Sequence, residues 1–116
     1  MSLLILVVDD DPDICHLLDR VLTRQGYRVT TALDGAEALA KIAASVPELV
    51  ITDLMMPRMS GWELIAHLRE QLPLLAIVIV SAAAEPPAFG GIPFLAKPFA
   101  LDTLLAMVRQ RLPSTA

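Results

Sequence analysis

The stretch LILVVDDDP at residues 4–12 decides the fold. With Leu3 before it, it begins with the run LLILVV at 3–8, which is apolar without polar alternation and typical of a strand buried on both faces of a parallel sheet. Asp11 and Pro12 then suit the N-cap and the first position of a helix. The apolar residues that follow repeat with the spacing of one helix face: Ile14, Leu17, Leu18, Val21 and Leu22. A buried strand therefore leads into an amphipathic helix through three consecutive aspartates.

The same alternation of strand and helix runs through the rest of the chain. Four further strands are predicted at short apolar stretches: residues 28–32, 49–52, 76–80 and 92–96. Three further amphipathic helices are predicted, one from the capping-box-like pair Asp34 and Glu37, one over 64–72 and one over 101–112. Alternating strands and helices are joined by right-handed crossovers, so the sequence predicts an α/β fold with a doubly wound parallel sheet.

Length and composition suit one domain without a membrane span. We expect the 116 residues to form a single domain over 1–116, with a loose tail at 113–116. No apolar run approaches the ~18 residues that a spanning helix needs. A net charge of -4 argues against a nucleic-acid-binding surface. The single cysteine, Cys15, excludes an internal disulfide and favours the reducing cytoplasm.

Residues suited to chemistry lie at the ends of the predicted strands. Asp9 and Asp10 follow the first strand, Asp53 follows the third, Ser81 the fourth and Lys97 the fifth. These carboxyl ends meet at one edge of a doubly wound sheet, where ligands bind. Carboxylates gathered there repel one another, and a hard cation such as Mg²⁺ together with a lysine compensates the repulsion. A nucleophilic carboxylate, a metal and charged donors are the set that phosphoryl transfer to a carboxylate requires.

Four motifs, in this order and spacing, resemble the response-regulator receiver domains of bacterial two-component systems: LILVVDDDP, VITDLMMPRMSG, VIVSA and FLAKPF. Together they span nearly the whole chain, which is far more specific than one short match. The resemblance implies a flavodoxin-like five-stranded sheet of order 2-1-3-4-5. It also implies a regulatory domain, not an enzyme, that accepts a phosphoryl group from a sensor histidine kinase or histidine phosphotransfer protein. The implied cofactor is Mg²⁺, with Mn²⁺ as a substitute.

The resemblance assigns the metal and acceptor roles residue by residue. Asp53 is the phosphoacceptor and also a metal ligand. Asp9 and Asp10 are the acidic pair that holds Mg²⁺, with Asp10 as the direct ligand, and the backbone carbonyl of Met55 completes the protein ligands. Asp11 is better explained as a helix cap than as a ligand.

The resemblance also assigns a switch. Ser81 matches the hydroxyl residue that contacts the phosphoryl group on activation, and Lys97 matches the lysine that pairs with that group. Phe94, three residues before Lys97, matches the aromatic switch residue. Pro98 implies a cis Lys97-Pro98 bond.

Two departures from the family pattern are visible. Ser81 and Lys97 are only 16 residues apart, so the fourth helix of the family is expected to be shortened or replaced by a loop over 82–91. This segment contains two prolines and two glycines, which oppose a long helix. Ala100 stands where the last helix would have a polar cap, and its side chain offers no acceptor.

Two alternative functions stay open. A haloacid-dehalogenase-like phosphatase also has two aspartates two positions apart after its first strand, which would make Asp9 the nucleophile beside Asp11. The longer chain and further acidic pair of those enzymes are missing, and turnover of a phosphate ester would distinguish them. A receiver-like interaction module that signals without phosphorylation is suggested by the altered 82–91 segment. Whether Asp53 can be modified distinguishes that module from a phosphorylated receiver.

Overall fold

Five parallel strands form a single sheet at the centre of the molecule. The computed structural model describes residues 2–82 and 91–112. Its strands are β1 (Leu4–Val8), β2 (Arg28–Ala32), β3 (Leu49–Thr52), β4 (Ala76–Ser81) and β5 (Phe94–Ala96). Their order in the sheet is β2-β1-β3-β4-β5, all parallel. The predicted fold class and strand order are confirmed.

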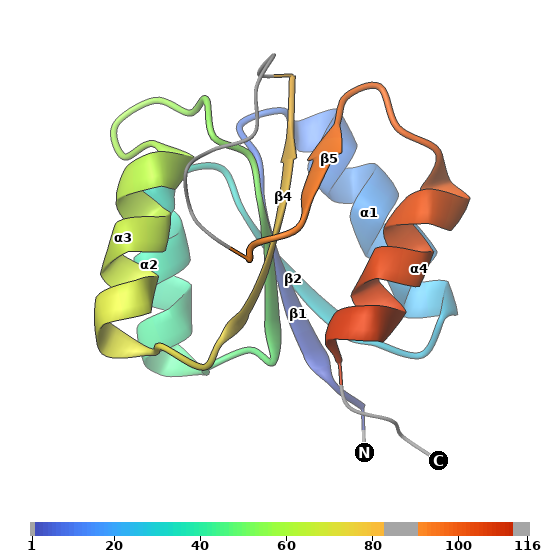
Figure 1. Ribbon diagram of the computed structural model, residues 1–116, viewed down its shortest axis with the longest axis horizontal. Helices are drawn as coiled ribbons and strands as arrows, with labels where there is room; N and C mark the ends of the chain where they lie inside the picture. Colours follow the sequence, from blue (N-terminus) through green and yellow to red (C-terminus); the bar gives the residue numbers. More distant parts are fainter. Residues whose placement is uncertain (1, 83–90, 113–116) are drawn as a thin grey trace.

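Four helices cover the sheet within the described residues. They are α1 (Pro12–Arg24), α2 (Gly35–Ala44), α3 (Gly61–Gln71) and α4 (Leu101–Arg111). Figure 1 shows α2 and α3 on one face of the sheet and α1 and α4 on the other. Among the described helices, none is long and apolar enough to cross a membrane. The loop predicted at 82–91 falls largely on residues 83–90, outside the described residues, and stays a prediction.

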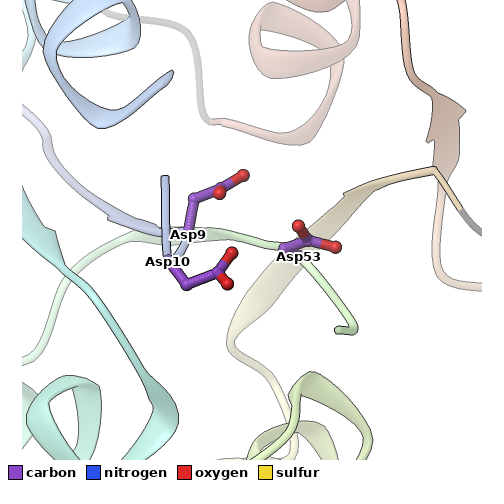
Figure 2. A group of neighbouring side chains, drawn as sticks. All are labelled: Asp9, Asp10 and Asp53. Atoms are coloured by element: carbon purple, nitrogen blue, oxygen red, sulfur yellow. The ribbon is translucent and has the colours of Figure 1, made fainter. Parts of the chain in front are cut away.

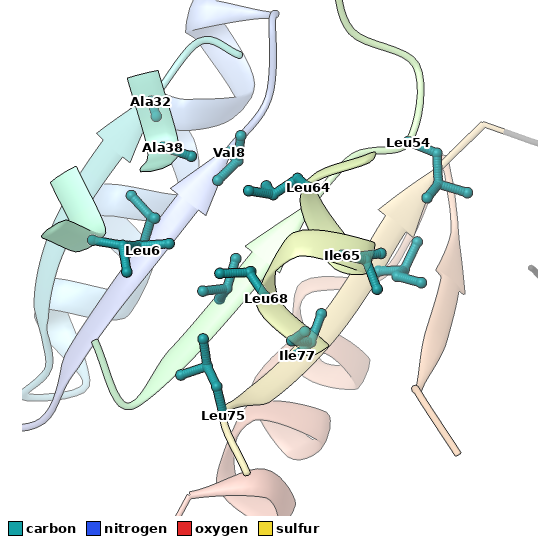
Figure 3. Close-up of a cluster of buried hydrophobic side chains, with 13 residues drawn as sticks. Leu6, Val8, Ala32, Ala38, Leu54, Leu64, Ile65, Leu68, Leu75 and Ile77 are labelled. Atoms are coloured by element: carbon teal, nitrogen blue, oxygen red, sulfur yellow. The ribbon is translucent and has the colours of Figure 1, made fainter. Parts of the chain in front are cut away.

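The side chains of β1 divide between two cores, one on each face of the sheet. Leu6 and Val8 pack into the cluster beneath α2 and α3, which is drawn in Figure 3. Ile5 and Val7 pack into the cluster beneath α1 and α4. Successive strand residues point to opposite faces, so a continuously apolar strand fills both cores.

Side-chain caps begin three of the helices. Asp11 accepts from the Asp13 N–H at the start of α1, and Asp34 accepts from the Glu37 N–H at the start of α2. Ser60 caps α3 in the same way. No side-chain cap is found for α4 among the described residues, where Ala100 occupies the N-cap. The caps expected at Asp11 and Asp34, and the missing cap at Ala100, are confirmed.

The last strand is shorter than predicted. The sequence predicts a strand from residue 92, whereas β5 begins at Phe94. Pro93 has no N–H to donate to the ladder, although its carbonyl oxygen accepts from the Ile79 N–H at 2.9 Å. Regular pairing with β4 therefore starts one residue after the proline. The Lys97-Pro98 bond that follows is cis, as expected.

Candidate functional site

Three carboxylates come together at the carboxyl ends of the two central strands. Asp9 and Asp10 follow β1, and Asp53 follows the neighbouring strand β3. The Asp53 N–H donates to the Val8 carbonyl at 2.9 Å, which brings Asp53 level with the end of β1. One carboxylate oxygen from each aspartate lies within 4.8 Å of the others, as the side chains in Figure 2 illustrate. We call these three residues the acidic cluster.

Asp53 is buried, and its two carboxylate oxygens have different partners. Oδ1 accepts from the Leu54 N–H at 2.6 Å and from the Met55 N–H at 3.3 Å. Oδ2 accepts from the Lys97 ammonium at 3.0 Å. The backbone carbonyl of Asp53 accepts from the Thr52 hydroxyl at 2.8 Å, a contact that the sequence analysis did not identify. The signal available in the sequence was the hydroxyl-bearing Thr52 directly before Asp53.

Lys97 joins two members of the acidic cluster. Its Nζ lies 2.7 Å from Asp9 Oδ2 and 3.0 Å from Asp53 Oδ2. The Lys97 N–H donates to the Ser81 carbonyl at 2.9 Å, which fixes the lysine backbone to the end of β4. Burial lowers the pKa of Lys97, but the hydrogen bonds that Lys97 donates to Asp9 and Asp53 outweigh this effect, so the pKa is raised overall. The ammonium is therefore held in its charged form.

Asp9 is the more buried member of the pair that follows β1. Only 3% of Asp9 is exposed, whereas Asp10 is exposed to solvent. Burial raises the pKa of Asp9, and the hydrogen bond from Lys97 offsets only part of that rise. The Asp9 backbone is held by the thiol of Cys15, whose Sγ lies 3.3 Å from the Asp9 carbonyl oxygen. Burial is also the main cause that raises the pKa of this thiol, to about 11.

The two predicted switch residues lie on the neighbouring strands β4 and β5. Ser81 ends β4 and is fully buried. Phe94 begins β5, is partly buried and packs against the cluster beneath α2 and α3. In the ladder, Phe94 pairs with Ile79 and Ser81 pairs with Ala96. Their contacts with a phosphoryl group stay predictions.

The β3–α3 loop, residues 53–60, is closed tightly against the site. The Gly61 N–H donates to the Leu54 carbonyl at 3.0 Å. A Cβ atom at Gly61 would lie 1.9 Å from the Asp53 carbonyl oxygen, a separation that real Cβ atoms do not show. Only glycine lets α3 begin this close to the backbone of Asp53.

Two further charged residues connect this loop to the β2–α2 turn. The Arg58 guanidinium binds the carboxylate of Asp34, which is itself buried. The sequence analysis identified Asp34 only as a helix cap and did not identify Arg58. No local pattern pairs two residues 24 positions apart, so this contact required the tertiary structure.

The acidic cluster fits a hard divalent cation. Carboxylate oxygens are the ligands that Mg²⁺ prefers, and it commonly uses one or two carboxylates with a phosphate and several waters. Three carboxylates face one ammonium here, which leaves negative charge for a cation to neutralise. Met55 lies next to Asp53 because its N–H donates to Oδ1, while its carbonyl stays a predicted ligand.

Comparison with curated proteins identifies similar chains. The family model of the response regulator receiver domain matches residues 5–109. The response regulator MprA of Mycobacterium ulcerans is 42% identical over 121 aligned positions, which cover 99% of this chain and 52% of that protein. MprA of Mycobacterium tuberculosis is also 42% identical, with 53% of its length covered. The chain thus spans about half the length of the curated relatives it matches.

Solved structures show the same likeness. The response regulator TrrA of Thermotoga maritima, in complex with Mg²⁺-BeF, has a TM-score of 0.87 and 34% identity, with 97% of this chain and 100% of that chain covered. The chemotaxis protein CheY4 of Vibrio cholerae has a TM-score of 0.88 and 32% identity, with the same coverage. Receiver domains bind Mg²⁺ at an acidic pocket, and an acidic cluster is present here. The chain therefore belongs to the response regulator receiver domains of two-component systems.

Proposed function

We propose that the chain is a phosphorylation switch in which Asp53 accepts a phosphoryl group in a Mg²⁺-dependent reaction. The observation that carries this proposal is the Lys97 ammonium between Asp9 and Asp53, at 2.7 Å and 3.0 Å, inside the acidic cluster. Response regulators receive phosphate from sensor kinases. The donor for this chain is the phosphohistidine of a sensor histidine kinase or a histidine phosphotransfer protein. Mn²⁺ can take the place of Mg²⁺.

The contacts of Asp53 favour one of its oxygens as the nucleophile. Two backbone N–H groups hold Oδ1, whereas Oδ2 has the side-chain ammonium of Lys97 as its partner. Oδ2 forms the new bond to phosphorus as the bond between phosphorus and the donor imidazole nitrogen breaks. The bound cation supplies neutralisation of the phosphoryl charge, and Lys97 supplies a second positive charge from the protein.

Phosphorylation of Asp53 then alters a partner-binding surface of the domain. Ser81 donates its hydroxyl to the phosphoryl group, and Phe94 changes its packing on β5 in response. Ser81 and Phe94 are close in the ladder because both lie on paired strands β4 and β5.

We propose that the domain covers 1–116, acts in the cytoplasm, and binds neither membrane nor nucleic acid by itself.

Intact-protein mass spectrometry after incubation with acetyl phosphate tests the proposal. Wild type should gain one phosphoryl group when Mg²⁺ is present and none when it is chelated. Asp53→Asn should gain none, whereas the matched control Asp19→Asn, on α1, should react like wild type. Addition that persists in Asp53→Asn would show that another carboxylate is the acceptor. No addition to wild type would favour an interaction module that signals without phosphorylation.

A further inference from the structure

Asp34 lies outside the acidic cluster and is buried. Its carboxylate binds both a backbone N–H group and a side-chain guanidinium. It is 1% exposed. Its Oδ1 accepts from the Glu37 N–H at 2.8 Å and so caps α2. Its Oδ2 binds the guanidinium of Arg58 from the β3–α3 loop. The backbone hydrogen bond from Glu37, followed by the bond from Arg58, holds the pKa of Asp34 below its usual value.

Arg58 has a backbone conformation that needs support. Its φ is +65°, in the left-handed region, and among the described residues other than glycine it is the one with positive φ. Such a conformation is unfavourable for a residue with a side chain and persists only where surrounding contacts hold it. The Arg58 side chain is 72% exposed, so packing provides little of that support. The contact with the buried Asp34 carboxylate provides it.

A second contact joins the same two segments. The Gly35 N–H donates to the Met59 carbonyl at 3.2 Å. A Cβ atom at Gly35 would lie 2.7 Å from Met59 Cγ and 2.9 Å from the Met59 carbonyl oxygen. The β3–α3 loop is therefore attached to the start of α2 by a charged contact and an adjacent backbone contact.

Each of the two joined segments is also attached to a member of the acidic cluster. On one side, the Asp9 N–H donates to the Ala32 carbonyl at 3.0 Å, just before the turn that carries Asp34. On the other side, the loop carries Met55, whose own side chain is 68% exposed and gives it no anchorage. The position of the Met55 backbone is thus set by Asp53, by the closure at Gly61 and by the attachment through Arg58.

We infer that the Asp34–Arg58 pair is a positioning device that holds the β3–α3 loop in the geometry needed to bind Mg²⁺. Neither residue would touch the metal. Both act through the Met55 backbone and through the Leu54 and Met55 N–H groups that donate to Asp53 Oδ1. The inference rests on the proposed function, because it concerns the affinity of the same acidic cluster for Mg²⁺. Partners one layer outside the ligands typically change metal affinity by about 10- to 100-fold.

The variants Asp34→Asn and Arg58→Gln test the inference. Asparagine keeps an acceptor at Oδ1 for the cap of α2 but replaces Oδ2 with an amide that cannot accept from Arg58. Mg²⁺ affinity is measured by titration of the fluorescence of Trp62, the single tryptophan, which follows Gly61 at the start of α3. Each variant should raise the Kd for Mg²⁺ by about tenfold, and the double variant should raise it no further.

Arg69→Gln is the matched control, because it makes the same substitution at the other end of α3. Arg69 donates to the Pro73 carbonyl at 3.4 Å and to the Leu75 carbonyl at 2.9 Å, both beyond the C-terminal end of α3. It should lower the free energy of unfolding, measured with urea in the presence of a chelator, and leave the Kd unchanged. A Kd that rises equally in Arg69→Gln would overturn the inference, since general destabilisation would then explain it.

Two further outcomes separate the inference from the proposed function. Wild type that binds Mg²⁺, with an unchanged Kd in Asp34→Asn and Arg58→Gln, would overturn the inference alone. Wild type that binds no Mg²⁺ would overturn the proposed function and the inference together.

Discussion

Replacing Lys97 with methionine removes the positive charge from between Asp9 and Asp53 while keeping a long apolar side chain. At separations of 2.7 Å and 3.0 Å, the Coulomb energy of one such ion pair is about 6 kcal/mol at an effective dielectric near 20. Removing one partner of a buried pair costs about 3–5 kcal/mol in measured cases. Because the Lys97 side chain is 20% exposed and partly screened, we expect a loss near the lower end, about 3 kcal/mol at pH 7.5 without metal.

The pH dependence of this loss has a definite sign. Burial already raises the pKa of Asp9, and Lys97 is the partner that lowers it, so Lys97→Met should raise this pKa further. A carboxyl group whose pKa is raised in the folded protein binds its proton more tightly there than in the unfolded chain. Stability therefore rises as the pH falls through the folded pKa, and the deficit of Lys97→Met should be smaller at pH 5 than at pH 7.5.

Mg²⁺ should reduce the same deficit. Lys97 binds two of the carboxylates that would hold the cation, and its positive charge repels that cation by about 1–2 kcal/mol, even with strong screening by water. The Kd of Lys97→Met for Mg²⁺ should accordingly fall by about tenfold.

The assay is urea unfolding at both pH values, with Mg²⁺ and with a chelator, followed by titration of Trp62 fluorescence. Lys41→Met is the control, because Lys41 is the other lysine of the chain; its ion pair with Glu37 is half-exposed, and it also donates to the Thr31 carbonyl. The control should change stability by only about 1 kcal/mol, equally at both pH values. A Lys97→Met protein as stable as wild type without metal, or one that binds Mg²⁺ more weakly, would refute the reasoning.

Three other changes test features of the backbone and core. Gly61→Ala should lower the free energy of unfolding by about 3 kcal/mol, because the added Cβ clashes with the Asp53 carbonyl. Gly26→Ala should lower it by only about 1 kcal/mol, because open space surrounds this glycine and only its positive φ opposes the substitution. Equal losses in urea unfolding would contradict this contrast. Ala100→Asp should stabilise the protein by about 1 kcal/mol by capping α4, and an unchanged Tm would argue against that cap. Cys15 should react slowly with an aromatic disulfide reagent at pH 8 until urea unfolds the chain, because its pKa is about 11 and it is buried; rapid reaction of the folded protein would be the contrary result.

Features that depend on near neighbours in the sequence were predictable. The caps at Asp11 and Asp34 need only a side-chain oxygen and an N–H two or three residues later. The meeting of Asp9 and Asp53 was also predictable, because parallel strands bring their carboxyl ends to one edge of the sheet. The order and spacing of the four motifs also predict the family, which the family model confirms.

Features that depend on distant partners were not predictable in the same way. The predicted start of β5 at residue 92 was wrong. The apolar pattern includes Pro93, and its missing N–H prevents regular pairing there. The burial of Asp34 and its contact with Arg58 arise from two loops that meet only in the folded chain. The thiol of Cys15 likewise finds the Asp9 carbonyl through packing, and its place on a helix face did not reveal this.

The two outer strands of the sheet also bear on how the protein behaves when it is concentrated. β2 lies at one border and carries the exposed Arg28, whereas β5 at the other border has only three residues and lies between Pro93 and Pro98. Charged and very short edge strands, and prolines beside them, offer a poor template to a strand from another molecule. These two edges therefore disfavour edge-to-edge pairing of the sheet with a second copy of the chain.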